Sequence, residues 1–105
     1  MKEIDVKTLK KWQDAGKDFT LIDVRELNEY EFANLGGDLI PMGSVADRLD
    51  EIPKDKDVVI MCRSGMRSAN IINYLNKEEG YERLYNLKGG ILAYSDEIDP
   101  SIPKY

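Results

Sequence analysis

Apolar and polar positions divide the chain into short apolar runs separated by amphipathic segments. Residues 57–61 are apolar on both faces and mostly β-branched, as in a central strand of a parallel sheet, and residues 19–24 form a similar run. Shorter apolar runs lie at residues 39–42 and 84–87. Apolar residues near helical spacing, with capping residues and glycines at their ends, predict helices over residues 5–14, 26–32, 44–49, 68–78 and 91–98.

Strands that alternate with helices predict an α/β fold. Such a chain forms a mainly parallel sheet covered by helices on both faces, in a three-layer α/β/α arrangement. The length of 105 residues suits one domain, and we expect a single domain over residues 1–105. The chain has no long apolar run and its charged start does not resemble a signal peptide. We therefore expect a cytoplasmic monomer with no membrane partner.

Charge and composition exclude several classes of function. The formal net charge is −5 and the Lys and Arg residues are scattered, which argues against a nucleic-acid partner. The absence of histidine excludes Cys–His and Ser–His–Asp catalysis. A single cysteine cannot form an internal disulfide and leaves a zinc site short of ligands. We expect neither a metal nor a cofactor.

The segment from Cys62 to Ser68 follows the clearest strand and leads into a predicted helix. In open parallel sheets ligands bind beyond the carboxyl ends of the strands, which is where this turn places the thiol. Its backbone N–H groups can converge above the sulfur, and the helix N-terminus adds partial positive charge. Such surroundings lower a thiol pKa, so Cys62 can be a nucleophile without a histidine base. We expect its side chain at the mouth of the loop.

The rest of the loop is suited to binding an anion. The guanidinium groups of Arg63 and Arg67 match an oxyanion, the two serines add hydroxyl donors, and Gly65 permits a positive φ. A lone cysteine is more often an inert buried residue, but a thiol in this setting is expected to be reactive. The predicted substrate-binding residues are Arg63, Ser64, Gly65, Met66, Arg67 and Ser68.

Other residues near the predicted edge of the sheet are expected to have structural rather than catalytic roles. Asp23 and Arg25 could touch a substrate, but we expect them to form ion pairs or caps that brace the neighbouring loops. The glycines at 89–90 are expected to form a turn before the last helix, close to the cleft but not catalytic.

Three segments, taken in order, resemble motifs of the rhodanese family along nearly the whole chain. Residues 62–68 are similar to its Cys-Arg-Ser-Gly-x-Arg-Ser loop. Residues 21–30 look like its Asp-Val-Arg-Glu…Glu-Tyr element, and residues 86–94 look like its Leu-x-Gly-Gly-x-x-Ala-Trp/Tyr element. The resemblance implies the rhodanese-like three-layer fold, with a central, mainly parallel sheet of about five strands.

The resemblance also implies a persulfide mechanism. Cys62 would attack the outer sulfur of a small anionic donor such as thiosulfate, release sulfite and become a persulfide. The persulfide would pass its sulfur to cyanide, a thiol or a carrier protein. By the same analogy the loop amides cradle the persulfide, while Arg63 and Arg67 hold the oxyanion of the donor.

Two comparisons with the family refine this expectation. Residues 36–43 replace the family's Gly-His-Ile-Pro-Gly-Ala segment, so the histidine is missing, although the implied mechanism does not use it. Residues 93–105 look like the end of rhodanese domains fused to ubiquitin-activating-like sulfur-transfer proteins, which hand sulfur to a carrier protein. A protein acceptor is therefore one hypothesis for this chain.

Two other functions remain as alternatives. Cysteine-based phosphatases also place a cysteine and an arginine around an anion-binding loop, but their interval is one residue longer than the four residues between Cys62 and Arg67. The smaller loop suits a sulfur atom better than a tetrahedral phosphate, and no acid partner is evident. Related folds also persist as non-catalytic or slow sulfur-carrier and regulatory modules. The presence of Cys62 with both arginines argues against a purely non-catalytic role.

Overall fold

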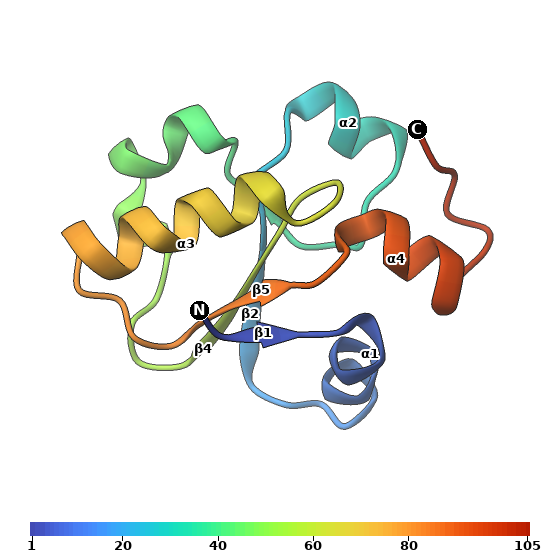
Figure 1. The fold of residues 1–105 in the computed structure, drawn as a ribbon, viewed down its shortest axis with the longest axis horizontal. Coiled ribbons are helices and arrows are strands. Elements are labelled where there is room, and N and C mark those ends of the chain that lie inside the picture. The colour runs from blue at the N-terminus through green and yellow to red at the C-terminus, as the bar shows by residue number, and fades with distance from the viewer.

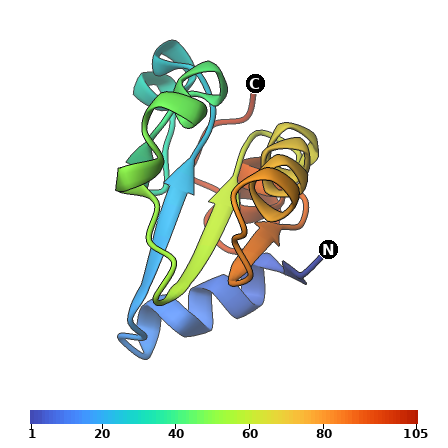
Figure 2. The same cartoon turned by 90° about the vertical axis from the view of Figure 1, so that its left-hand side faces the viewer.

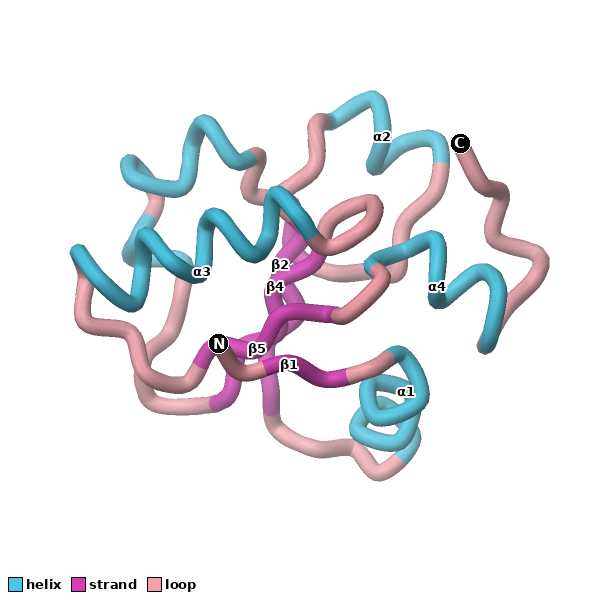
Figure 3. The backbone as a smooth tube through the Cα atoms, viewed as in Figure 1, coloured by secondary structure: helices cyan, strands magenta, loops and turns pink.

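The structure, a computed structural model that describes residues 1–105, is built on a five-stranded parallel sheet with the strand order β1-β5-β4-β2-β3. The strands are β1 (Glu3–Ile4), β2 (Phe19–Asp23), β3 (Asp38–Leu39), β4 (Asp57–Met61) and β5 (Leu84–Leu87). The helices are α1 (Val6–Asp14), α2 (Leu27–Phe32), α3 (Met66–Glu78) and α4 (Gly90–Glu97), with the 3₁₀ segments η1 (Met42–Asp47) and η2 (Leu49–Glu51) (Figures 1 and 3). The predicted parallel α/β fold of about five strands is confirmed.

The central strand β4 has an apolar core on each side, because successive side chains of a strand point to opposite faces. Val58 and Ile60 belong to a core cluster that includes residues of α3 and η1. Val59 and Met61 belong to a second cluster that includes residues of α1 and α4. The helices accordingly lie on both faces of the sheet, with α3 on one side and α1 and α4 on the other (Figures 1 and 2).

The helix boundaries follow from local capping chemistry. The Asp5 side chain accepts the N–H of Thr8 at 2.8 Å and caps α1, as the sequence predicted. Helix α2 begins with a reciprocal capping box between Glu26 and Glu29. Helix α3 begins at Met66 rather than at Ser68, because Gly65 takes a positive φ of 106° and its carbonyl already accepts the N–H of Ala69. The residues predicted to bind an anion therefore include the first turn of α3.

Two predicted elements differ from the structure, and one strand was not predicted. The helix expected over 44–49 is two short 3₁₀ segments, in a stretch that carries Gly43 in its first turn. The strand expected over 39–42 is reduced to Asp38–Leu39, since Pro41 has no N–H to donate. The two-residue β1 was not predicted, because so short a run has no periodicity, and it is fixed by its pairing with β5. No helix is both long enough and apolar enough to cross a membrane.

Candidate active site

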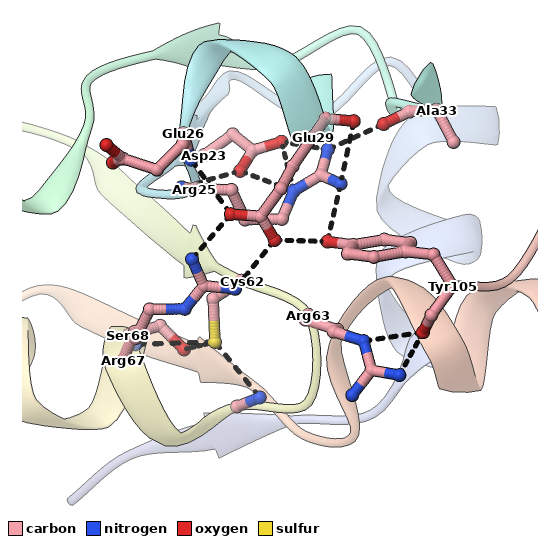
Figure 4. A network of polar contacts seen from close by, with 11 residues as sticks. Asp23, Arg25, Glu26, Glu29, Ala33, Cys62, Arg63, Arg67, Ser68 and Tyr105 are labelled. Atoms are coloured by element: carbon pink, nitrogen blue, oxygen red, sulfur yellow. Dashed lines mark hydrogen bonds and ion pairs between the residues drawn. The ribbon is translucent and has the colours of Figure 1, made fainter. Parts of the chain in front are cut away.

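The thiol of Cys62 lies directly after β4, at the carboxyl edge of the sheet and beside the start of α3. Its sulfur accepts the N–H of Gly65 at 3.1 Å and lies 3.5 Å from the backbone nitrogen of Ser68. The Ser68 hydroxyl is 3.3 Å away, and either atom of that pair can be the donor. Figure 4 shows these contacts converging on the sulfur. The strand–loop–helix turn therefore surrounds one sulfur atom with polar groups of its own backbone and of Ser68.

The Cys62 side chain is buried, with only 1% of its surface exposed, and it belongs to the core cluster on the α3 side of the sheet. The expectation that it lies at the mouth of the loop is wrong. The sulfur turns inward because its hydrogen-bond partners, Gly65 and Ser68, lie toward the start of α3. An open hollow of about 350 Å³ beside the loop is lined by Ser64 and Met66, among others, but not by Cys62.

Opposing effects set the pKa of the Cys62 thiol. Burial raises the pKa, because a charged sulfur loses its hydration. Hydrogen bonds to the thiolate lower the pKa: one from the Ser68 hydroxyl when its hydrogen turns to the sulfur, and others from the backbone N–H groups of Ser68, Gly65 and Ser64. The hydrogen bonds prevail, and the pKa lies below its ordinary value. The loop therefore favours a thiolate without a histidine base.

The turn at Gly89–Gly90 braces the active-site loop from the side of α4. Backbone N–H groups of Ile91 and Leu92 donate to the carbonyls of Cys62 and Arg63 at 3.1 and 3.2 Å. Gly90 has a φ of 60°, and a Cβ built on it would meet those two carbonyl oxygens at 2.4 and 2.5 Å. Only glycine allows so close an approach. The predicted turn is present, and its contact with the loop is direct.

Gly90→Ala is expected to destabilise the protein by about 3 kcal/mol, since positive φ strain adds to a backbone clash. Gly16→Ala is the matched control, because Gly16 has a φ of 66° but no atom within 4 Å of a built Cβ. That variant is expected to lose about 1 kcal/mol, the cost of the left-handed conformation alone. Urea unfolding of both variants measures the difference. Equal losses would show that the loop contact at Gly90 contributes nothing.

Both loop arginines already have partners in the structure. Arg67 forms two hydrogen bonds to the Glu29 carboxylate of α2, at 2.7 and 2.8 Å. The Nε of Arg63 donates to the main-chain oxygen of Tyr105 at 2.7 Å, its Nη2 contacts the same oxygen, and its guanidinium lies over the Tyr105 ring. An anionic ligand that used either guanidinium would share it with these oxygens or displace them.

Asp23 and Arg25 form an ion pair with each other, where the sequence had predicted ion pairs or caps without naming partners. Both side chains are fully buried, and Arg25 Nη2 lies 2.7 Å from Asp23 Oδ2. Arg25 also donates to the carbonyl of Ala33 at 2.7 Å and to the hydroxyl of Tyr105 at 3.0 Å. The pair thereby connects the end of β2 to α2 and to the chain near Tyr105 (Figure 4). Neither side chain forms a hydrogen bond to Cys62, and their arrangement fits a bracing role.

A comparison with protein families identifies the chain. The model of the family described as "Rhodanese-like domain" matches residues 5–97. The chain belongs to the rhodanese-like family. "Putative sulfurtransferase YtwF" of Bacillus subtilis is 38% identical over 101 residues, covering 95% of this chain and 96% of that protein. "Sulfurtransferase" of Allochromatium vinosum is 42% identical over 94 residues, covering 89% of this chain and 87% of that protein.

Other relatives of this rhodanese-like chain are longer proteins. The chain spans 30% of the "Rhodanese-like/PpiC domain-containing protein 12, chloroplastic" of Arabidopsis thaliana, at 43% identity over 81% of the chain. It spans 26% of the "Probable adenylyltransferase/sulfurtransferase MoeZ" of Mycobacterium tuberculosis, at 31% identity over 97% of the chain. The crystal structure of a rhodanese-like domain protein from Staphylococcus aureus has a TM-score of 0.83 at 30% identity, covering 100% of this chain and 99% of that one.

Three residues next to the rhodanese-like loop were not predicted to have a part in it. Glu29 was noted only as part of a motif, and its pairing with Arg67 depends on α2 lying over the loop. Tyr105 contacts Glu29, Arg25 and Arg63. These contacts depend on the path of the residues after α4, which the sequence pattern does not predict. Asn86 gave a usable signal, since it is a polar residue in the apolar strand β5 and is 4% exposed. A buried amide needs partners, which here are Ser68 and Gly65.

The ion pair between Glu29 and Arg67 predicts a pH dependence of stability. Hydrogen bonds from Arg67 and from the Tyr105 hydroxyl outweigh burial and hold the pKa of Glu29 at about 2, against an ordinary value of 4.5. A carboxylate with a depressed folded pKa stabilises the fold above its unfolded pKa and loses that contribution as pH falls through the folded pKa. Wild type is therefore expected to exceed Glu29→Gln in unfolding free energy at neutral pH, by a margin that shrinks between pH 4.5 and about 2. Urea unfolding across this range measures the margin, and a margin independent of pH would contradict the assignment.

Proposed function

We propose that this rhodanese-like chain is a sulfurtransferase that carries sulfur on Cys62 as a persulfide. The observation that carries the proposal is the convergence of the backbone N–H groups of Gly65 and Ser68 on one sulfur. These groups stabilise negative charge on sulfur, which the attacking thiolate and a bound persulfide both bear. Relatives named as sulfurtransferases support the same chemistry.

The first half of the proposed reaction loads the sulfur. The Cys62 thiolate forms a bond to the outer sulfur of a sulfane donor, and the donor's own bond to that sulfur breaks. With thiosulfate the electron pair of the broken bond leaves on sulfite; with a persulfide donor it leaves on a thiolate. Arg63 and Arg67 are proposed to contact an anionic donor, each sharing its guanidinium with the oxygen it already binds.

The second half passes the sulfur on. A nucleophile such as cyanide or a thiol, of a small molecule or of a carrier protein, attacks the outer sulfur, and Cys62 leaves as a thiolate. The similarity to a protein named as an adenylyltransferase and sulfurtransferase supports a protein acceptor as one form of this step. A low pKa of Cys62 makes its thiolate a better leaving group, so the same hydrogen bonds assist both halves.

A slow sulfur-carrier or regulatory module is the second candidate function. The 1% exposure of Cys62 favours it, because a donor has to reach a sulfur that the loop covers. A slow carrier would still form the persulfide but would turn over poorly with small acceptors. Release of sulfite and thiocyanate, followed over many turnovers with thiosulfate and cyanide, separates these two functions. Multiple turnovers favour the enzyme, and a single equivalent of sulfite favours the carrier.

Arg67→Ala is expected to weaken the use of thiosulfate by about 10- to 100-fold in kcat/KM, the effect of one charge-assisted contact. Turnover of an uncharged persulfide donor is expected to fall much less. Arg48→Ala is the matched control, since Arg48 is also paired with a carboxylate, that of Glu51, but is exposed and lies outside the loop. Equal losses of kcat/KM with both donors would contradict an oxyanion contact by Arg67. If kcat/KM fell with neither donor, Arg67 would not belong to the donor site.

A further inference from the structure

Asn86 lies in β5 with its side chain amide buried against the active-site loop. Its Nδ2 donates to the carbonyl of Gly65 at 3.0 Å, and its Oδ1 accepts the hydroxyl of Ser68 at 2.6 Å. The orientation of the amide follows from chemistry, because a carbonyl oxygen only accepts hydrogen bonds and Nδ2 must therefore face Gly65. Oδ1 then faces Ser68, and this oxygen can only accept.

The Ser68 hydroxyl has one hydrogen and two neighbouring acceptors. The hydrogen points to Asn86 Oδ1, so an oxygen lone pair faces the Cys62 sulfur at 3.3 Å. A neutral thiol suits this arrangement, since its S–H donates to Ser68 while the backbone of Gly65 donates to the sulfur. Every polar group of the cluster is then satisfied.

A thiolate does not suit the same arrangement, because it can only accept hydrogen bonds. To donate to the thiolate, the Ser68 hydroxyl has to turn its hydrogen away from Asn86, which leaves a buried Oδ1 without its donor. We infer that Asn86 is a positioning residue that holds the Ser68 hydrogen away from Cys62 and so favours the thiol over the thiolate. The functional meaning of this inference rests on the proposed function, in which Cys62 is the nucleophile and the leaving group.

The charged groups around the thiol do not provide this effect. They are Arg63 of the loop, Arg67 of α3, Glu29 of α2, the ion pair of Asp23 and Arg25 at the end of β2, Lys88 after β5, and Glu3 of β1, which pairs with Asn86 in the sheet. None of them forms a hydrogen bond to Asn86 or Ser68, whose side chains bond only to each other, to Gly65 and to Cys62. The choice between thiol and thiolate at this hydroxyl therefore depends on the neutral partner Asn86.

The inference predicts that removal of the Asn86 amide lowers the pKa of Cys62. In Asn86→Leu, which keeps a similar volume, the Ser68 hydroxyl is free to donate to the thiolate, and a fall of about one pKa unit is expected. The chain has a single cysteine, so isotope-labelled cysteine gives one Cβ NMR resonance whose pH titration reports this pKa directly. The titration uses no sulfur donor, so it decides the inference even if the protein forms no persulfide.

The control that separates positioning from a general structural disturbance is Ser68→Ala. In that background Asn86→Leu is expected to leave the pKa of Cys62 unchanged, because the hydroxyl that Asn86 orients is gone. Asn86→Val, whose β-branched side chain suits a strand, replaces Asn86→Leu if the latter does not fold. An unchanged or raised pKa in the single variant would overturn the inference. A fall that persists in the Ser68→Ala background would also overturn it.

Discussion

Cys62→Ser is expected to abolish sulfur transfer, lowering kcat/KM by about three orders of magnitude or more. A serine hydroxyl cannot form the persulfide bond, and it is a far weaker acid than a thiol whose pKa lies below its ordinary value. Initial rates of sulfite release at thiosulfate concentrations well below KM, with cyanide as the acceptor, measure the loss. The matched control is Ser44→Ala, which changes a hydroxyl of η1 that lies outside the loop and forms no hydrogen bond to Cys62.

The stability of the same variant tests the burial of the sulfur. The new hydroxyl would lie in the core cluster of Cys62, but it can accept the N–H of Gly65. We expect a loss of about 1 kcal/mol in the free energy of unfolding, because a polar atom replaces a buried sulfur and keeps a partner. Retained transfer in a folded Cys62→Ser variant would contradict the proposed nucleophile.

Arg25→Ala is expected to cause the largest loss of stability, about 3–5 kcal/mol. The substitution leaves the fully buried Asp23 carboxylate without its cation. It also removes the donors to the Ala33 carbonyl and to the Tyr105 hydroxyl, hydrogen bonds that connect the end of β2 to the end of α2 and to Tyr105. Urea unfolding, followed by circular dichroism, measures the change.

Arg48→Ala is the control for this prediction as well. Arg48 and Glu51 form a close ion pair, but both side chains are exposed, with 36% and 46% of their surface accessible. Exposed pairs are screened by water, so this variant is expected to change the free energy of unfolding only slightly. If both arginine variants lost the same small amount, the buried pair would not be the brace that its geometry suggests.

Much of the fold could be predicted from local patterns. The strand at 57–61 and the helices at 5–14 and 68–78 have strong periodicity and clear caps, and the structure reproduces them to within about two residues. The residues at 42–51 and 3–4 could not be assigned in this way. The 3₁₀ segments are too short for a periodic signal, and β1 exists because β5 supplies its hydrogen bonds.

The position of the thiol could be predicted, but not its surroundings. Because Cys62 follows a buried strand, it was correctly predicted to lie at the carboxyl edge of the sheet. Gly65 takes a positive φ, which its lack of a side chain permits. The sulfur points inward because particular backbone groups of the loop face it. The spacing of residues in the sequence does not reveal which groups these are. The partners of Arg67 and Arg63, Glu29 and Tyr105, come from elements 38 and 42 positions away in the chain.

A persulfide on Cys62 can be detected from the mass of the intact protein. The protein is reduced, incubated with thiosulfate or with a small-molecule persulfide, and measured before and after treatment with cyanide. We expect a gain of one sulfur atom, located on Cys62 by peptide mapping, absent in Cys62→Ser and removed by cyanide. No added sulfur with either donor, in a protein whose fold and free thiol are intact, would contradict it.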